Sequence, residues 1–459
     1  MQKKMLWVAL AWAFAQPATA TPSGDVNTQL AEMQAQIAQM KAAYEARIAA
    51  LEGKLAEAAK PGPGAAAVVP TNARSGAAAF NPEVSLILQG AYKERKKVAE
   101  RQISGFWSPG HDHADDHDHG HDKRGFSLDH TELVFSANID DTFRGQATLA
   151  LLDDQVELEE AWFQTLGLGH GVGLKAGRFF SGIGYLNEQH PHQWDFYDQP
   201  LMYKALFGEH SYAQDGVQAK WVAPTDLFVE LGAEFGRGQN FPGTERNSNG
   251  ANSRALFARV GDDWGTSHSW RAGLSYLRTE ARDRQAHMES GLTGDHVVAG
   301  FDGRSRVWLA DFVYKWAPEG NPKYRNFKFQ AEYFRRREDG RLSTADEDGV
   351  DLGVGNTPYA SRQSGFYLQG VYQFTPNWRA GLRYDRLNSG RQDLGNNPAD
   401  LETVDYRPRR SSVMVDYSWS EYSRLRLQLA RDRSMQGVTD NQVTLQYIMS
   451  LGSHGAHKF

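Results

Sequence analysis

Period-two alternation of apolar and polar residues runs from Phe80 almost to the C-terminus, and it constrains the fold more than any other feature of the sequence. About sixteen segments show the pattern, with one apolar or aromatic face and one polar face. In the segment 424–429 (RLRLQL), leucines occupy one face while arginine and glutamine occupy the other. This periodicity is that of β-strands, so we predict an all-β chain over most of its length.

The segments that connect these strands alternate between short and long. Short turns are predicted near 140–142, 166–171, 224–226, 375–377 and 420. Long polar stretches lie near 98–124, 180–212, 237–253, 279–303, 337–363 and 389–410. Short turns on one side and long loops on the other are typical of outer-membrane barrels, and aromatic residues at strand ends fit their interfacial girdles. We therefore predict a transmembrane antiparallel β-barrel of about sixteen strands.

The C-terminal segment and the composition agree with this prediction. Val443, Leu445, Tyr447, Met449 and Leu451 alternate with mostly polar residues, and the chain ends on Phe459. This pattern resembles the assembly signal of bacterial outer-membrane proteins, which implies outer-membrane lipids and the barrel assembly machinery as partners. Cysteine is absent, which excludes a disulfide scaffold and thiol chemistry. The net charge of −6 gives no reason to expect nucleic-acid binding.

The N-terminal region carries three further predictions. Residues 1–20 form a secretory signal peptide, with a basic start, a short apolar run and small residues before the cleavage point; an anchor helix is the alternative. Residues 25–60 place apolar side chains at heptad spacing and predict a periplasmic coiled coil that helps to hold a homotrimer. A helix packed on its own barrel is the alternative to that coiled coil. Residues 61–79 are a Pro/Gly/Ala linker, followed by the barrel at 80–459.

The segment Leu174–Phe180 (LKAGRFF) resembles the strand that leads into the third loop of the phosphate-selective O/P porin family. The organisation of the mature chain, with a helical segment before a barrel, is also similar to that family. The resemblance implies that the connection 181–212 folds inward and narrows a pore, with Trp194, Phe196, Tyr197 and Tyr203 packed against the wall. TonB-dependent receptors need a plug domain and a barrel of about 22 strands, for which the chain is too short.

The predicted external loop 98–124 contains a tract of alternating histidine and aspartate. Imidazole and carboxylate groups are ligands for zinc and other divalent cations. We therefore predict a metal-binding tract without fixed geometry, the alternative being a solvated acidic loop. No cofactor is required, and Zn²⁺ or another divalent cation is the ion that we expect to be bound or transported. The proposed ligands are His111, Asp112, His113, Asp115, Asp116, His117, Asp118, His119, His121 and Asp122.

The predicted constriction loop 181–212 holds a second candidate group, made of Glu188, His190, His192, Trp194 and Asp195. His190 and His192 form a cation site with Glu188 or Asp195 on one interpretation. On the other, these histidines cap turns around Pro191. His130 and Glu132, on the inward face of the second strand, are weaker candidates for the same path.

Charges of both signs project into the predicted lumen. The acidic ones are Glu132, Asp311, Glu332 and Asp385. The basic candidates for pore lining are more numerous: Lys175, Arg271, Lys328, Arg379, Arg383, Arg424 and Arg426. A basic lumen favours anions, whereas the His/Asp tract favours cations, so the sequence leaves ion selectivity open.

The function predicted from these features is an outer-membrane porin of a Gram-negative bacterium. It passes small hydrophilic solutes passively and is adapted to divalent metal uptake, with zinc as the first candidate. An anion-selective, phosphate-selective or general porin is one alternative. A structural envelope tether that uses the coiled coil is another. A barrel-embedded enzyme would need a nucleophile with its base or paired acids, and no motif indicates either, so no enzymatic activity is predicted.

Overall fold

The computed structural model describes residues 82–98, 101–107, 123–152, 155–289, 296–346, 357–395 and 404–452. The chain divides into two units, 1–74 and 75–459, and every described residue belongs to the second. The predicted signal peptide, coiled coil and linker therefore lie outside the described residues. So does the whole His/Asp tract from His111 to Asp122.

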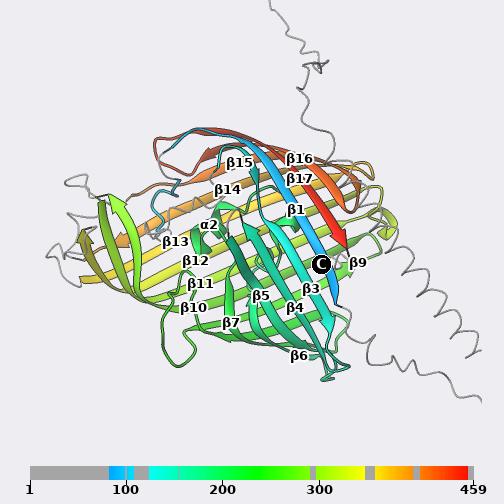
Figure 1. Ribbon diagram of the computed structural model, residues 1–459, viewed down its shortest axis with the longest axis horizontal. Coiled ribbons are helices and arrows are strands. Elements are labelled where there is room, and N and C mark those ends of the chain that lie inside the picture. Colours follow the sequence, from blue (N-terminus) through cyan, green and yellow to red (C-terminus); the bar gives the residue numbers. More distant parts are fainter. Residues whose placement is uncertain are drawn as a thin grey trace, which may run out of the picture. The chain divides into compact units, whose positions relative to one another are not determined.

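The described residues form one closed antiparallel sheet of 17 strands, shown in Figure 1. The strands follow one another around the wall in chain order, and β1 pairs with β17 to close the barrel. Both β2 and β3 pair with β1, so they share one position, and the barrel has 16 strand positions. The bounds are β1 Glu83–Glu94, β2 Gly125–Leu128, β3 Thr131–Asn138, β4 Phe143–Leu152, β5 Gln155–Thr165, β6 Val172–Phe180, β7 Ala213–Val222, β8 Phe228–Gly236, β9 Ser253–Trp264, β10 His268–Glu289, β11 His296–Trp316, β12 Asn326–Asp346, β13 Thr357–Gln373, β14 Trp378–Asp393, β15 Arg409–Ser420, β16 Ser423–Arg433 and β17 Asp440–Gly452.

The polarity of this barrel is opposite to that of a soluble protein. Large apolar side chains such as Leu274 and Leu382 are exposed on the outer face. Buried polar side chains such as Gln330, Glu332 and Arg336 line the inner face of β12. An apolar exterior around a polar interior is the arrangement of a transmembrane barrel, because lipid surrounds the outside. The predicted fold of about sixteen antiparallel strands is confirmed.

Several predicted loops are too long, because the strands continue beyond the apolar band. β10 has 22 residues and β12 has 21, whereas about 9–11 residues cross a bilayer. Most of 279–303 and 337–363 is therefore paired strand, and only the connection 394–408 remains of the loop predicted at 389–410. Beyond the apolar band the outer face of a strand meets water instead of lipid, so the outward apolar residues end while the backbone ladder goes on. The apolar residues of these extensions, such as Phe301 and Leu342, lie buried on the inner face.

The connection between β6 and β7, residues 181–212, folds into the barrel. It contains two short helices, η1 Pro191–Gln193 and α2 Leu201–Phe207, and α2 contacts β12, β13 and β14 (Figure 1). Trp194, Phe196 and Tyr203 are buried, and they pack with wall residues such as Tyr367 and Val371. A second 3-10 helix, η2 Pro318–Gly320, lies in a short turn.

Of the helices in the described part of the chain, none has the length and apolar character needed to cross a membrane.

Candidate metal site in the barrel lumen

The loop 181–212 is fixed at its base and along its length. The Asn187 side chain donates to the carbonyl oxygens of Ser181 and Tyr212 and accepts the Tyr212 N–H at 2.7 Å, which ties the two ends of the loop together. The buried Glu332 carboxylate on β12 accepts the backbone N–H groups of Tyr185 and Leu186. Because these polar groups are buried and satisfied, the loop is a rigid partition in the lumen.

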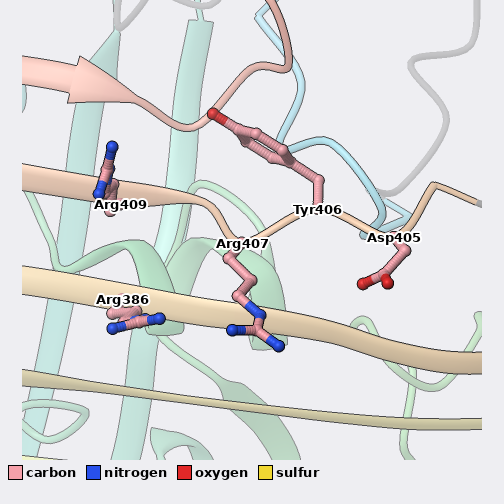
Figure 2. Close-up of a pocket in the computed structure, with 5 residues that line it drawn as sticks. All are labelled: Arg386, Asp405, Tyr406, Arg407 and Arg409. Carbon is pink, nitrogen blue, oxygen red and sulfur yellow. The ribbon is translucent and has the colours of Figure 1, made fainter.

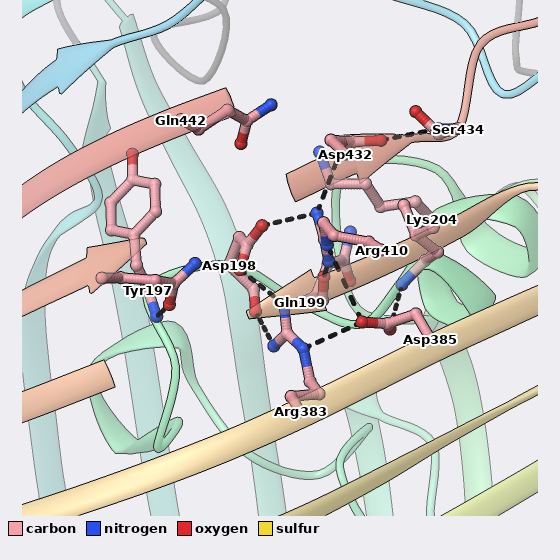
Figure 3. Close-up of polar contacts among 12 residues, drawn as sticks. Tyr197, Asp198, Gln199, Lys204, Arg383, Asp385, Arg410, Asp432, Ser434 and Gln442 are labelled. Atoms are coloured by element: carbon pink, nitrogen blue, oxygen red, sulfur yellow. Dashed lines mark hydrogen bonds and ion pairs between the residues drawn. The ribbon is translucent and has the colours of Figure 1, made fainter. Parts of the chain in front are cut away.

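The middle of the loop is held to the far wall by ion pairs. Asp198 lies 2.6 Å from the Arg383 guanidinium and 2.5 Å from that of Arg410, and Figure 3 shows it between these two groups. Asp195 pairs with Lys328 at 2.5 Å and with Arg379 at 3.1 Å. Burial raises the pKa of both aspartates, but the neighbouring cations outweigh it and hold each pKa well below its ordinary value.

All seven predicted pore-lining cations lie on the inner face, and most of them contact loop 181–212. Lys328, Arg379 and Arg383 pair with its aspartates. Arg271 lies over the Tyr185 ring, and Arg426 donates to the Trp194 carbonyl at 2.8 Å. The others are Lys175, which lies over the Trp162 ring, and Arg424, whose Nε is buried. Much of the basic charge thus holds the loop in place, which weakens the argument for anion selectivity.

Across the lumen, the same loop brings His190 and His192 against β3 and β5. His192 Nδ1 lies 3.0 Å from Glu132 Oε1. His190 Nε2 lies 3.0 Å from Glu160 Oε2, and its Nδ1 lies 3.3 Å from Glu132 and 3.4 Å from Glu159. We call the group completed by His130 the lumen cluster: His130, Glu132, Glu159, Glu160, His190 and His192.

Two β-bulges supply the wall half of this cluster. Leu149 pairs with Leu158 and Thr148 with Glu160, so Glu159 has no residue opposite it. A bulge of this kind breaks strict alternation, and it turns both Glu159 and Glu160 toward the lumen.

The second bulge lies between β2 and β3. Gly90 pairs with Leu128 and Ile87 with Glu132, so the second strand has one more residue than β1 over this stretch. The extra residue lies in the break at Asp129 and His130, and it places both His130 and Glu132 on the inner face. Bulges are found more often than expected next to functional sites, where they re-aim side chains.

The lumen cluster has the geometry of a divalent metal site. His130, Glu132 and Glu159 each place a possible ligand atom within 4.8 Å of the others, and His130 Nε2 lies 3.0 Å from Glu159 Oε1. Metal–ligand bonds of about 2.0–2.2 Å around a tetrahedral ion put neighbouring ligand atoms about 3.3–3.6 Å apart. The contacts in the cluster, from 3.0 to 3.5 Å, overlap this range and extend slightly below it.

The ligand atoms of the cluster are also incompletely satisfied. The Oε2 atoms of Glu132 and Glu159 and Nδ1 of His190 are buried, with no hydrogen bond of good geometry to a described residue. The contacts of the two carboxylate oxygens are those with the His190 imidazole, at 3.3 and 3.4 Å, and buried carboxylates of this kind are stabilised further by a cation. The residues present therefore fit a divalent cation bound by imidazole and carboxylate.

The cluster carries excess negative charge. Burial alone would lower the pKa of the His190 imidazole, but the carboxylates of Glu132, Glu159 and Glu160 outweigh it and raise this pKa well above its ordinary value. Three buried glutamates around three histidines make this the acidic wall of the lumen, opposite the basic wall that holds the loop.

The acidic partners predicted for His190 and His192 are wrong. Glu188 pairs with Arg259 at 3.0 Å and with Lys220 at 2.9 Å. Asp195 pairs with the far wall, and the Trp194 ring donates to the Gln189 carbonyl at 3.1 Å. The loop turns between these residues, so neighbours in sequence face different walls. Glu159 and Glu160 were not among the predicted residues, whereas His130 and Glu132 were predicted as weaker candidates.

The long loop that follows β1 also contacts loop 181–212. Its described part, 101–107, packs into the barrel mouth: Ile103 and Phe106 join the apolar cluster of loop 181–212, and Trp107 stacks on Tyr359. The chain returns at Lys123, whose carbonyl accepts a hydrogen bond from Arg95. The described residues on either side of the His/Asp tract, 101–107 and 123–130, thus contact the barrel, and β2 is followed directly by His130.

Comparison with known proteins gives a relative that aligns with most of this chain. No family model matches the chain. An uncharacterized protein of Aquifex aeolicus is 32% identical over 410 residues, which cover 83% of this chain and 80% of the relative. The chain belongs to the same family as this Aquifex protein.

Solved structures resemble the chain in fold. OmpTdeltaL8, a loop L8 deletion mutant of an outer membrane protein of Vibrio cholerae, aligns with a TM-score of 0.50 and 11% identity. The alignment covers 81% of this chain and 99% of that one. An anion-selective porin from Comamonas acidovorans aligns with a TM-score of 0.47 and 9% identity, over 81% of this chain and 99% of that one. The fold is that of outer-membrane barrels with 16 strands.

Proposed function

We propose that this protein is an outer-membrane porin that passes small hydrophilic solutes and is adapted to divalent cations, with Zn²⁺ as the first candidate. The single observation that carries the proposal is the lumen cluster, in which three imidazoles and three carboxylates meet between the wall and loop 181–212. A porin passes ions without a covalent step, and the proposal includes no enzymatic activity. Binding that is weak enough to be reversible gives selectivity without blocking flow.

The His/Asp tract belongs to the same proposal as the point of first capture. Its five histidines raise the local concentration of metal near the barrel mouth, and the chain then runs through β2 to His130. We further propose export by the signal peptide and a homotrimer held by the coiled coil at 25–60. The resemblance of Leu174–Phe180 to phosphate-selective porins supports the barrel architecture, and much of the lumen's basic charge is already paired.

Replacing Glu159 with glutamine is expected to weaken the effect of zinc on the channel. This change removes one charged ligand of the cluster and keeps the side chain's shape. The zinc concentration that modulates single-channel current in a planar bilayer should rise by about tenfold to a hundredfold, the range in which changes around metal sites act. Asp311→Asn is the matched control, because Asp311 is a buried lumen carboxylate outside the cluster.

Zinc modulation that is identical in wild type and Glu159→Gln would overturn the metal proposal and leave a general or anion-selective porin.

A deletion of 111–122 should reduce the sensitivity of the channel to dilute zinc without removing the modulation of its current. A purified protein that forms no channel would contradict the porin itself and favour the structural tether.

A further inference from the structure

Arginine side chains gather on the outer face of the barrel, across β11 to β15 and on the loop side of the apolar band. Residues directly opposite each other in neighbouring antiparallel strands share a face. Arg306 pairs with Arg337, Arg337 with Arg362, and Arg386 with Arg409. Four of these residues and two neighbouring arginines form what we call the arginine patch. It comprises Arg335, Arg337, Arg362, Arg386, Arg407 and Arg409, all exposed.

The arginine patch is electrostatically unsatisfied by the described part of the chain. Like charges directly opposite each other destabilise a sheet. Arg306, at its edge, pairs with Asp339, but no described carboxylate forms an ion pair with any of the six members. The described part of the sheet carries this repulsion at several strands, which makes the patch a favourable surface for an anion.

The position of the patch indicates where this anion comes from. On β12, Arg335 follows two residues after the exposed Tyr333, and it lies opposite Trp308 of β11. On β14, Arg386 follows four residues after the exposed Leu382. The patch therefore begins where the outer apolar band ends, at the height at which lipid headgroups meet a barrel.

Two adjoining pockets make the surface suitable for an amphipathic molecule. The first, of about 360 Å³, is lined by Arg386, Asp405, Tyr406, Arg407 and Arg409. Figure 2 shows Asp405, its only carboxylate, at the opposite end of the pocket from Arg386 and Arg409. The second, of about 340 Å³, shares Arg386 and Arg407 with the first and adds the rings of Tyr333 and Phe366. Cationic groups thus lie directly beside an apolar groove.

We propose that the arginine patch binds the phosphate groups of a phosphorylated glycolipid in the membrane leaflet on the loop side. Guanidinium groups bind phosphate oxygens in pairs of parallel hydrogen bonds, which suits arginine better than lysine. The adjoining aromatic groove receives the start of an acyl chain. A second copy of this face is disfavoured, because two arginine patches repel each other.

The test is lipid binding by the full chain in an uncharged detergent, measured by native mass spectrometry and by titration. The probes are diphosphoryl lipid A, its dephosphorylated form and inorganic phosphate. Wild type should bind diphosphoryl lipid A at least about tenfold more tightly than the dephosphorylated form, given the strength of charge-assisted hydrogen bonds. The triple variant Arg386→Gln, Arg407→Gln, Arg409→Gln should lose that preference.

The control is a charge-matched triple variant at the short-turn end, Arg144→Gln, Lys323→Gln, Arg325→Gln. It should keep the preference for diphosphoryl lipid A, which would show that the loss in the patch variant does not come from the change in net charge. Equal binding of diphosphoryl lipid A by wild type and the patch variant would overturn the proposal. Full competition by inorganic phosphate would also overturn it, because the site would then recognise free anion. A change of oligomeric state in the patch variant with unchanged lipid binding would assign the face to a second copy instead.

Discussion

Replacing Glu132 with glutamine is expected to reduce the affinity of the lumen cluster for Zn²⁺ by about a hundredfold or more, because a buried carboxylate that ligates the metal directly is lost. Glu132 is the centre of the cluster: its carboxylate lies 3.0 Å from His192, 3.3 Å from His190 and 3.5 Å from His130. Glutamine keeps the volume but offers one neutral oxygen. Isothermal titration of a variant that lacks 111–122 isolates the lumen site from the tract.

Glu338→Gln is the control for this measurement. Glu338 is equally buried in the lumen, where it pairs with Arg284 at 2.7 Å, away from the cluster. Its substitution should leave zinc affinity unchanged. If Glu132→Gln and Glu338→Gln both have the zinc affinity of the wild type, then the lumen cluster is a hydrogen-bonded structural contact between loop 181–212 and the barrel wall.

The second large effect concerns the position of loop 181–212. Asp198→Ala is expected to destabilise the folded barrel by about 1.5–3 kcal/mol, because two buried guanidinium groups lose a carboxylate partner and keep only their contacts with Asp385 and Asp432. Asp198 neutralises Arg383 and Arg410 and also accepts a hydrogen bond from Gln428 at 2.9 Å (Figure 3). Urea unfolding followed by tryptophan fluorescence measures the loss, and single-channel current should become larger and noisier as the loop leaves its position.

Asp215→Ala provides the comparison for Asp198→Ala. Asp215 pairs with Arg178 at 2.6 Å, but both side chains are about a third exposed. An exposed ion pair contributes at most about 1 kcal/mol to stability. The free energy of unfolding of this variant should therefore be close to that of the wild type. Equal destabilisation by the two changes would show that the Asp198 contacts do not hold the loop.

The fold was largely predictable from the sequence because lipid enforces one rule along every strand. Leucines 425, 427 and 429 must face outward, and their neighbours must face inward. Loop lengths were less predictable, since this rule stops at the edge of the apolar band. Beyond it, β10 and β12 keep their backbone pairing without an outward apolar face, so their ends look like loops in the sequence.

The candidate site was predictable only in part, because strict alternation also fails at bulges within the strands. His190 and His192 were identified because loop 181–212 was expected inside the barrel. Glu159 and Glu160 were missed because strict alternation points only one of two consecutive residues inward.

A signal for that bulge exists in the sequence. Exposed apolar residues fall at Val156 and Leu158 and then at Phe163, so the outward positions change from even to odd numbers within β5. A parity change within one strand indicates an extra residue, and here it coincides with two glutamates. The partners of Glu188 and Asp195 depend on how the loop turns in three dimensions, which no periodicity reports.

The most direct test of the account is the position of zinc in crystals of the variant that lacks 111–122. Anomalous scattering at the zinc edge should show an ion within about 2.0–2.2 Å of ligand atoms from His130, Glu132 and Glu159, next to loop 181–212. A protein that binds zinc in solution but shows no anomalous peak between β3, β5 and this loop would contradict the account.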